Sequence, residues 1–124
     1  MRKTTLIFII WLVASGIAYY FLTEPKPEII NAKVLSVIDG DTIEISTGQK
    51  VRFLGINTPE KGMPNYLEAK NFLKKLLENR TIRLEVFSKD RYGRLLAHVF
   101  YGKTHINEEI LRNGLAHLFY YEKD

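Results

Sequence analysis

Cysteine is absent from the 124 residues of the chain. This absence excludes a disulfide framework, thiolate metal sites and a cysteine nucleophile. The sequence also lacks internal repeats and low-complexity tracts. A domain of this chain must therefore be stabilised by its apolar core alone.

A strong charge surplus is lacking as well. Arg2 and Lys3 precede a long apolar run, and the rest of the chain has 16 Lys and Arg against 14 Asp and Glu, which leaves +2. Such a mild surplus does not by itself indicate a nucleic-acid partner.

A long hydrophobic run is present at residues 4–22, which contain no charged side chain. As a helix, 19 residues extend about 28 Å, close to the hydrocarbon core of a membrane. Because Arg2 and Lys3 lie before the run, we expect the remainder on the extracytoplasmic side. A cleaved signal peptide is the alternative, with Gly16 and Ala18 as the small residues before the cleavage site. A buried core helix is disfavoured, since every face of the run is apolar and the rest of the chain is too small to enclose it.

These features divide the chain into three parts. Residues 1–22 are predicted to be a membrane anchor or signal peptide, and residues 23–29, with two prolines, an extended linker. Residues 30–124 have the length of one compact domain. We expect this domain at the cell membrane on its extracytoplasmic side, or secreted if the N-terminal segment is cleaved.

Strand patterns dominate the first part of the domain. Residues 29–38 and 41–46 are predicted strands joined by a turn at Asp39-Gly40, and residues 51–56 form a third. A polar loop, 57–64, precedes a helix at 65–79, for which Asn65 is the expected N-cap and Glu68 its capping-box partner. The helix has one apolar stripe.

Two more strands, 81–88 and 95–101, follow the helix, with a turn at 89–94 between them. A short helix at 107–114, capped by Asn107 and ended by Gly114, leads to a short extended segment. This order predicts an α+β fold: a five-stranded OB-type barrel with a helix after the third strand and a short helix near the C-terminus.

Several oxygen donors lie at two of the predicted turns. Asp39 and Asp41 flank Gly40, and Asn57, Thr58 and Glu60 begin the loop after the third strand. If the barrel brings strands 1 and 3 together, these loops meet, and their oxygens suit a hard cation such as Ca²⁺. The same residues are also ordinary turn and loop signals, so composition alone leaves both interpretations open.

Arginines and aromatic residues allow two interpretations in the same way. Arg52 lies within an apolar strand and Arg94 after a turn, where each could bind phosphate or take part in a structural ion pair. Tyr92 and Tyr120 could stack on bases or cover the core. The histidines show no nucleophile or metal pattern.

Four motifs in a fixed order narrow these alternatives: IDGDT at 38–42, R…GINTPE at 52–60, DRYGR at 90–94 and INEEILRNGLA at 106–116. Together they resemble the staphylococcal nuclease (thermonuclease) family over residues 32–121. The resemblance implies an OB-fold barrel and a Ca²⁺-dependent phosphodiesterase that acts on DNA and RNA. We expect a monomer.

Site roles follow from the resemblance residue by residue. It implies that Asp41, Asn57 and the Thr58 backbone carbonyl bind Ca²⁺. Glu60 corresponds to the proposed general base, and Arg52 and Arg94 to the phosphate clamp. The residues at the nucleotide pocket are Arg91, Tyr92 and Tyr120.

Two departures from the family pattern qualify these expectations. Asn57 stands where the family usually has aspartate, so we expect weaker Ca²⁺ binding. The family pattern also continues with a helix beyond Tyr121, where this sequence has three more residues. Both departures motivate an alternative function, a non-catalytic OB-type module that binds nucleic acid or protein.

Overall fold

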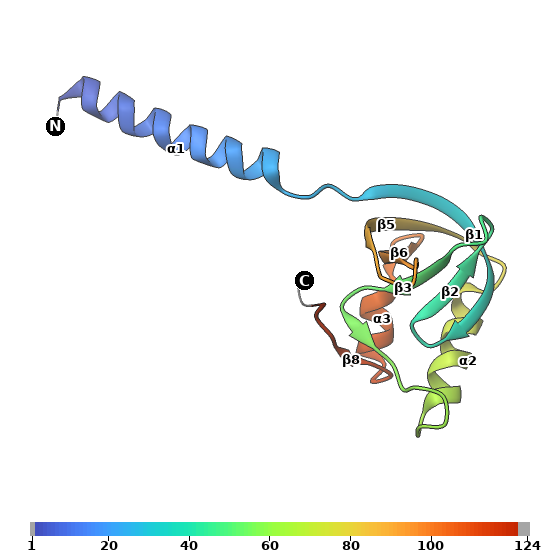
Figure 1. Cartoon of the computed structure of the whole chain (residues 1–124). Helices are drawn as coiled ribbons and strands as arrows, with labels where there is room; N and C mark the ends of the chain where they lie inside the picture. Colours follow the sequence, from blue (N-terminus) through green and yellow to red (C-terminus); the bar gives the residue numbers. More distant parts are fainter. Residues whose placement is uncertain (1, 122–124) are drawn as a thin grey trace.

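Alternating apolar residues build the barrel of the computed structural model, which describes residues 2–121. The strands are β1 (Glu28–Asp39), β2 (Thr42–Ile45), β3 (Lys50–Phe53), β4 (Ile56–Asn57), β5 (Thr81–Lys89), β6 (Leu95–Tyr101), β7 (Thr104–His105) and β8 (His117–Leu118). The helices are α1 (Lys3–Thr23), α2 (Tyr66–Leu77) and α3 (Ile106–Arg112). Figure 1 shows α1 projecting away from the domain formed by the other elements.

The sheet closes on itself. Its strand order is β3-β2-β1-β5-β6-β7, and β3 also pairs in parallel with β6, so β1, β2, β3, β5 and β6 form a closed barrel. This confirms the OB-type α+β fold. We expected strands 1 and 3 to meet across the barrel. Instead β2 lies between them, and closure is made by β3 and β6.

Strand β1 is long enough to serve two neighbours. Residues 28–33 pair with β5, and residues 34–39 pair with β2. Because β1 is curved, its two halves can pair with different strands of the barrel. Figure 1 shows β1 bending around the right-hand side of the domain.

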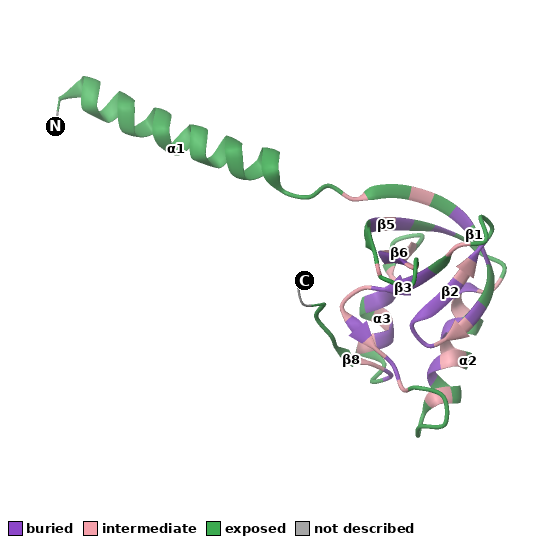
Figure 2. Cartoon of the chain, viewed as in Figure 1, coloured by how far each residue is buried: buried purple, intermediate pink, exposed green. Residues whose placement is uncertain are grey.

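The core fills the barrel and the space under both domain helices. The period-two pattern of β5 places Ile82, Leu84 and Val86 inside, as predicted. Helix α2 buries Ala69, Leu73 and Leu77 against the barrel, which confirms its apolar stripe. Figure 2 shows these buried segments concentrated in the domain, whereas α1 is exposed throughout.

Two capping predictions were wrong. Asn65 occupies the N-cap position of α2, but its backbone is left-handed (φ 68°) and its side chain makes no cap hydrogen bond. Helix α3 begins one residue earlier than expected, so its N-cap is His105, and Asn107 lies inside the helix. The buried Asn107 side chain instead accepts from the Val99 N–H (2.9 Å) and donates to the Leu54 carbonyl (2.8 Å), which ties α3 to the barrel.

The third predicted strand is interrupted. A turn at Leu54 and Gly55 (φ 80°) separates β3 from β4, because only glycine adopts this backbone conformation without strain. Strand β4 then leaves the barrel and pairs with β8, the extended segment predicted near the C-terminus. This break directs Asn57 and Thr58 toward the turn between β1 and β2.

Candidate active site

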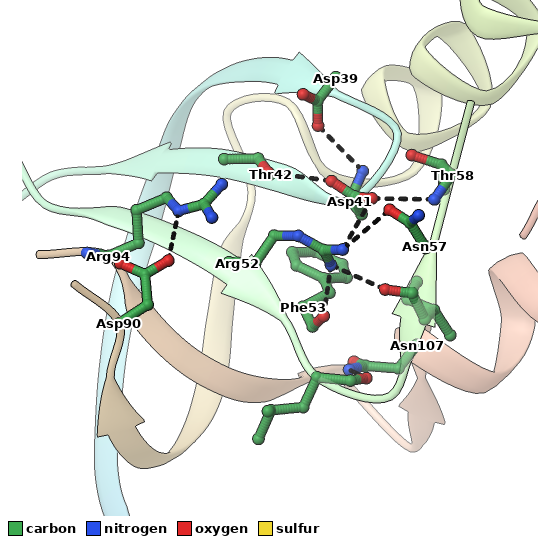
Figure 3. A network of polar contacts seen from close by, with 12 residues as sticks. Asp39, Asp41, Thr42, Arg52, Phe53, Asn57, Thr58, Asp90, Arg94 and Asn107 are labelled. Atoms are coloured by element: carbon green, nitrogen blue, oxygen red, sulfur yellow. Dashed lines mark hydrogen bonds and ion pairs between the residues drawn. The ribbon is translucent and has the colours of Figure 1, made fainter. Parts of the chain in front are cut away.

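The side chain of Asp41 is the centre of a buried polar cluster (Figure 3). It lies in the turn between β1 and β2 and is only 5 % exposed. One carboxylate oxygen, Oδ1, accepts from the Thr42 hydroxyl (3.0 Å), and the other, Oδ2, accepts from the Thr58 backbone N–H (2.9 Å). The two loops predicted to meet therefore do so through this carboxylate.

Glycine at position 40 allows the loops to approach. A Cβ atom there would lie 2.8 Å from the Thr58 hydroxyl oxygen and 2.8 Å from the Ala69 Cβ, closer than real Cβ contacts. A side chain at this position would push the loop after β4 and helix α2 away from Asp41. Gly40 is thus required by close packing.

Arg52 extends from β3 into the same cluster and is only 6 % exposed. Its Nη1 donates to the carbonyls of Phe53 (2.7 Å) and Ile56 (2.8 Å), which fix the guanidinium in place. Its Nη2 lies 3.3 Å from Asp41 Oδ2 and donates to Asn57 Oδ1 at 3.1 Å. The arginine is therefore a member of a buried ion pair, with its fork held by backbone oxygens.

The donor atoms around Arg52 Nη2 fit a hard cation. The Asp41 carboxylate and the Asn57 amide oxygen both face this one nitrogen, and the Thr58 backbone is held beside them. Within residues 2–121, no three His, Cys, Asp or Glu side chains group closely enough to hold a metal ion. A cation here would depend on one carboxylate with amide and backbone oxygens, a set that suits Ca²⁺ more than a softer metal.

Asp39 adds a second acid close to this cluster. Its Oδ1 accepts from the Asp41 backbone N–H at 3.3 Å. Burial, together with the nearby Asp41 carboxylate, raises the pKa of Asp39 to about 6. Two acids thus lie together at this turn, and Arg52 is the basic residue that pairs with Asp41 in the described part of the chain.

Glu60 lies at the edge of the cluster and is exposed. It lines a shallow pocket of about 350 Å³ together with Asn57, Thr58 and His117. Glu60 therefore shares a pocket with Asn57 and Thr58, two residues of the cluster around Asp41. His117, which carries no metal or nucleophile pattern in the sequence, lies in the same pocket because β8 pairs it with Asn57.

A second pocket, of about 720 Å³, contains the other predicted site residues. Arg91, Tyr92, Arg94 and Tyr120 all line it, with Phe119 and Tyr121 beside them. The Arg91 and Arg94 guanidinium carbons lie 5.0 and 5.5 Å from the centre of the Tyr92 ring. The pocket thus combines positive charge with exposed aromatic surface, a combination suited to stacked bases and phosphates.

Arg94 is positioned by an acidic neighbour. Its Nε donates to Asp90 Oδ2 at 2.7 Å (Figure 3). Burial raises the pKa of Asp90, but the hydrogen bonds from Arg94 outweigh this effect, so the pKa lies below its usual value. Asp90 engages Nε, which is one of the five donors of a guanidinium, and Arg94 lines the pocket.

The two halves of the site adjoin through the closing strands of the barrel. Arg52 in β3 is the register partner of Leu96 in β6, and Leu96 lines the pocket of Arg94. Neighbouring strands lie about 4.8 Å apart, so the Asp41 cluster and the Arg94 pocket are on adjacent parts of one surface. Closure between β3 and β6 is therefore what unites the predicted residues.

Two further polar features had no clear sequence signal. Asn107 resembled a helix cap and is instead a buried connector. His98 Nδ1 and His105 Nε2 lie 2.9 Å apart, joined across the β6–β7 pair. Seven residues separate these histidines, and only the short hairpin brings them together.

Comparison with known proteins agrees with this architecture. The family described as "Staphylococcal nuclease homologue" matches residues 50–124. Over 142 residues, the chain is 38 % identical to the Thermonuclease of Staphylococcus hyicus, covering 98 % of this chain and 84 % of that protein. It is 41 % identical over 99 residues to the Thermonuclease of Staphylococcus intermedius, covering 71 % and 59 % of the two proteins. It is also 37 % identical over 108 residues to Endonuclease YncB of Bacillus subtilis, covering 77 % and 51 %.

The closed barrel and its paired polar pockets thus define a protein of the OB-fold class. The chain belongs to the staphylococcal nuclease family. The aligned region spans only a little over half of the second and third relatives, so their whole activities do not transfer automatically.

Proposed function

We propose that this protein is a Ca²⁺-dependent nuclease that hydrolyses phosphodiester bonds of DNA and RNA. A nuclease is supported by relatives named thermonuclease and endonuclease. The observation that carries the proposal is the convergence of Asp41, Asn57 and Thr58 around Arg52, beside the pocket of Glu60. Ca²⁺ bound by these oxygens would polarise the phosphodiester and offset its developing charge.

Glu60 is proposed as the general base. Its carboxylate is exposed in a pocket that admits water, so it can accept a proton from the attacking water at one of its oxygens. The family resemblance and the position beside the donor set support this role.

The arginines are proposed to bind the phosphate. Arg52 is held by two carbonyls through Nη1, and its Nη2 becomes available to a phosphate when a cation takes over Asp41. Arg94 is held by Asp90 through Nε and offers its terminal nitrogens from the neighbouring pocket. Guanidinium groups stabilise the charge that develops on a phosphoryl group. In the same pocket, Arg91, Tyr92 and Tyr120 are proposed to bind the nucleotide.

Helix α1 is proposed to hold the domain at a membrane. It has 21 residues, a mean hydropathy of 2.1 and no buried residue, which meets the length and composition of a membrane span. A signal sequence meets the same test. Exposed apolar residues on every face of α1 favour a lipid environment before any cleavage.

The test is cleavage of labelled DNA and RNA by the full chain in mild detergent, with millimolar Ca²⁺ or with a chelator. We expect cleavage only with Ca²⁺, and a loss of roughly 10²–10⁴ in rate for Glu60→Gln. Glu68→Gln, an exposed acid on α2, is the matched control and should retain full activity. A folded chain that cleaves neither substrate would contradict the proposal.

One observation favours a second candidate, the non-catalytic binding module. Arg52 already neutralises Asp41, and Asn57 supplies no charge to attract a cation. A binding module predicts that Arg94→Ala weakens nucleic-acid affinity while no metal condition produces cleavage. The same assay, combined with a binding measurement, separates the two candidates.

A further inference from the structure

The start of the domain lies very close to the end of α1. Only residues 24–27 separate Thr23, the last residue of α1, from Glu28, the first residue of β1. Four extended residues span at most about 14 Å. If α1 crosses a membrane, the first part of β1 therefore lies near the lipid headgroups.

The register of β1 with β5 identifies what else lies there. Glu28 pairs with Val86 and Ile29 with Glu85, in an antiparallel ladder. Strand β5 is antiparallel to β1 and continues beyond Val86 to Lys89, so it extends toward the end of β1 at which the linker enters. In Figure 1, β5 and β6 lie beside the point where the linker enters β1, whereas the start of α2 lies at the far end of the domain.

The turn between β5 and β6 has the chemistry of a membrane interface. Lys89, Arg91 and Tyr92 are all exposed there, and Tyr92 is 69 % exposed. Tyr120, 78 % exposed, lines the same pocket. Tyrosine and basic side chains are the residues that proteins place at headgroup level, where the ring is half apolar and the cation meets lipid phosphate.

Helix α1 provides an independent marker of that level. Tyr19 and Tyr20 are exposed at its C-terminal end and have the position of an aromatic belt. Glu24 and Glu28 are the acids on the adjoining linker and strand, and Asp90 is already engaged by Arg94. Residues 89–94 carry Lys89, Arg91 and Arg94 against Asp90, and residues 24–28 carry Lys26 against Glu24 and Glu28. A small surplus of positive charge therefore remains, and it lies on the turn.

We infer that the β5–β6 turn docks on an anionic lipid surface, so that the pocket of Arg94 opens beside the membrane to which α1 anchors the chain. This inference rests on the membrane anchoring part of the proposed function. It assigns Lys89 to the lipid surface, together with Arg91 and Tyr92, which line the substrate pocket and are thus available to a nucleotide only while the turn is off the lipid. Nucleic acid then reaches the pocket along the membrane surface.

The inference is tested by labelling single cysteines with a fluorophore. Because the natural chain has no cysteine, each introduced cysteine is the one site that is labelled. The full chain is reconstituted in phosphatidylcholine vesicles with or without phosphatidylglycerol. A fluorophore is placed in Tyr92→Cys, in Lys103→Cys at the opposite end of β6, or in Ser15→Cys within α1. Quenching is measured with nitroxides carried on the lipid headgroup or on the acyl chain.

The expected result has three parts. Ser15→Cys is quenched by the acyl-chain nitroxide, Tyr92→Cys by the headgroup nitroxide, and Lys103→Cys by neither. Phosphatidylglycerol increases quenching at position 92. Since each basic residue near an anionic surface contributes about fivefold to its occupancy, replacing Lys89 and Arg91 by glutamine should weaken the contact by roughly 25-fold.

Other results overturn the inference in distinguishable ways. If the Ser15→Cys label is not quenched by the acyl chain, α1 is not inserted and the anchoring proposal fails together with the docking surface. If that label is quenched but positions 92 and 103 behave alike, only the docking surface fails. If the fluorescence of the label at position 92 changes when a DNA oligonucleotide is added but is never quenched by the lipid nitroxides, the turn binds nucleic acid and does not bind lipid. The nuclease assay is independent of all three results.

Discussion

Replacing Arg52 by methionine tests whether Arg52 and a bound cation compete for the carboxylate of Asp41. Methionine keeps much of the aliphatic volume but removes the ion pair to Asp41 (3.3 Å) and the bonds to the Phe53 and Ile56 carbonyls. Both side chains of the ion pair are 7 % exposed, so the Asp41 carboxylate would stay buried with no counter-charge. The variant should therefore be destabilised in the absence of metal.

The size of the effect follows from the geometry. Removing one partner of a buried ion pair typically costs about 3–5 kcal/mol. A Coulomb estimate at 3.3 Å with an effective dielectric constant near 20 gives about 5 kcal/mol. Thr42 and Thr58 still donate to the carboxylate, so we expect a loss near the lower end, about 3 kcal/mol. This is a large share of the roughly 5–15 kcal/mol that stabilises an ordinary domain.

Ca²⁺ should restore part of this loss, because it supplies the missing counter-charge. Binding at ten times the Kd stabilises the folded state by about 1.4 kcal/mol. In the wild type the cation must first displace Arg52 from Asp41, so Ca²⁺ should stabilise the variant more than the wild type. The measurement is urea unfolding in detergent followed by circular dichroism, with and without Ca²⁺.

Two variants serve as controls for this experiment. Arg83→Met removes an arginine whose pairing with Glu85 is exposed, and it should cost less than about 1 kcal/mol. Asp41→Asn in the Arg52→Met background removes the stranded charge and should abolish the extra response to Ca²⁺. If Arg52→Met is as stable as the wild type, or if Ca²⁺ stabilises both equally, the reasoning is refuted.

Two further predictions concern packing and pH. Gly40→Ala places a Cβ atom 2.8 Å from both the Thr58 hydroxyl oxygen and the Ala69 Cβ. It should lower the free energy of unfolding in urea by about 1–3 kcal/mol and weaken Ca²⁺ binding. An unchanged free energy of unfolding and an unchanged Ca²⁺ affinity would show that the loop does not need this close approach. Burial, and then the charge of neighbouring His105, lower the pKa of His98 below its ordinary 6.5, so the folded state takes up a proton less readily than the unfolded state. Stability should therefore fall as pH decreases below about 6.5 and level off once His98 is protonated in the folded state. His98→Gln should reduce this slope in unfolding curves between pH 7 and 5, and an unchanged slope would assign the dependence elsewhere.

Many of the strands and helices were predictable because the spacing of their apolar residues follows the period of a strand or of a helix. Ile82, Leu84 and Val86 alternate with polar residues, and Leu73 and Leu77 lie on one helical stripe. Such patterns follow from which face must be buried, so they are visible without knowledge of the partner element. The family resemblance then supplied the barrel topology, which local patterns alone left open.

The features that were missed depend on contacts between distant segments. Asn107 carries the sequence signal of a helix cap, but the carbonyl of Leu54 and the N–H of Val99 draw it into the core. The pairing of Asp41 with Arg52 likewise depends on the register between β2 and β3, which sets Thr42 opposite Arg52. The local alternation of apolar and polar residues carries no signal for such a contact, because the contact depends on which strands and helices pack together.

The role of each site residue stays a prediction, although the structure brings most of them to one surface. Asp41, Asn57 and Thr58 meet around Arg52, and Glu60 lines the adjoining pocket. The pocket that contains Arg91, Tyr92, Arg94 and Tyr120 is joined to them through the β3–β6 pair.

The central claim is that a cation bound at Asp41, Asn57 and Thr58 supports phosphodiester cleavage. The most direct measurement is the initial cleavage rate as a function of free Ca²⁺ for the wild type and Asn57→Asp. The substitution adds a carboxylate that faces Arg52 Nη2, as Asn57 Oδ1 does at 3.1 Å. We expect the Ca²⁺ midpoint to fall by about tenfold, since Ca²⁺ affinity rises with the number of charged ligands. An unchanged midpoint would show that position 57 does not bind the ion and would contradict the assignment of the site.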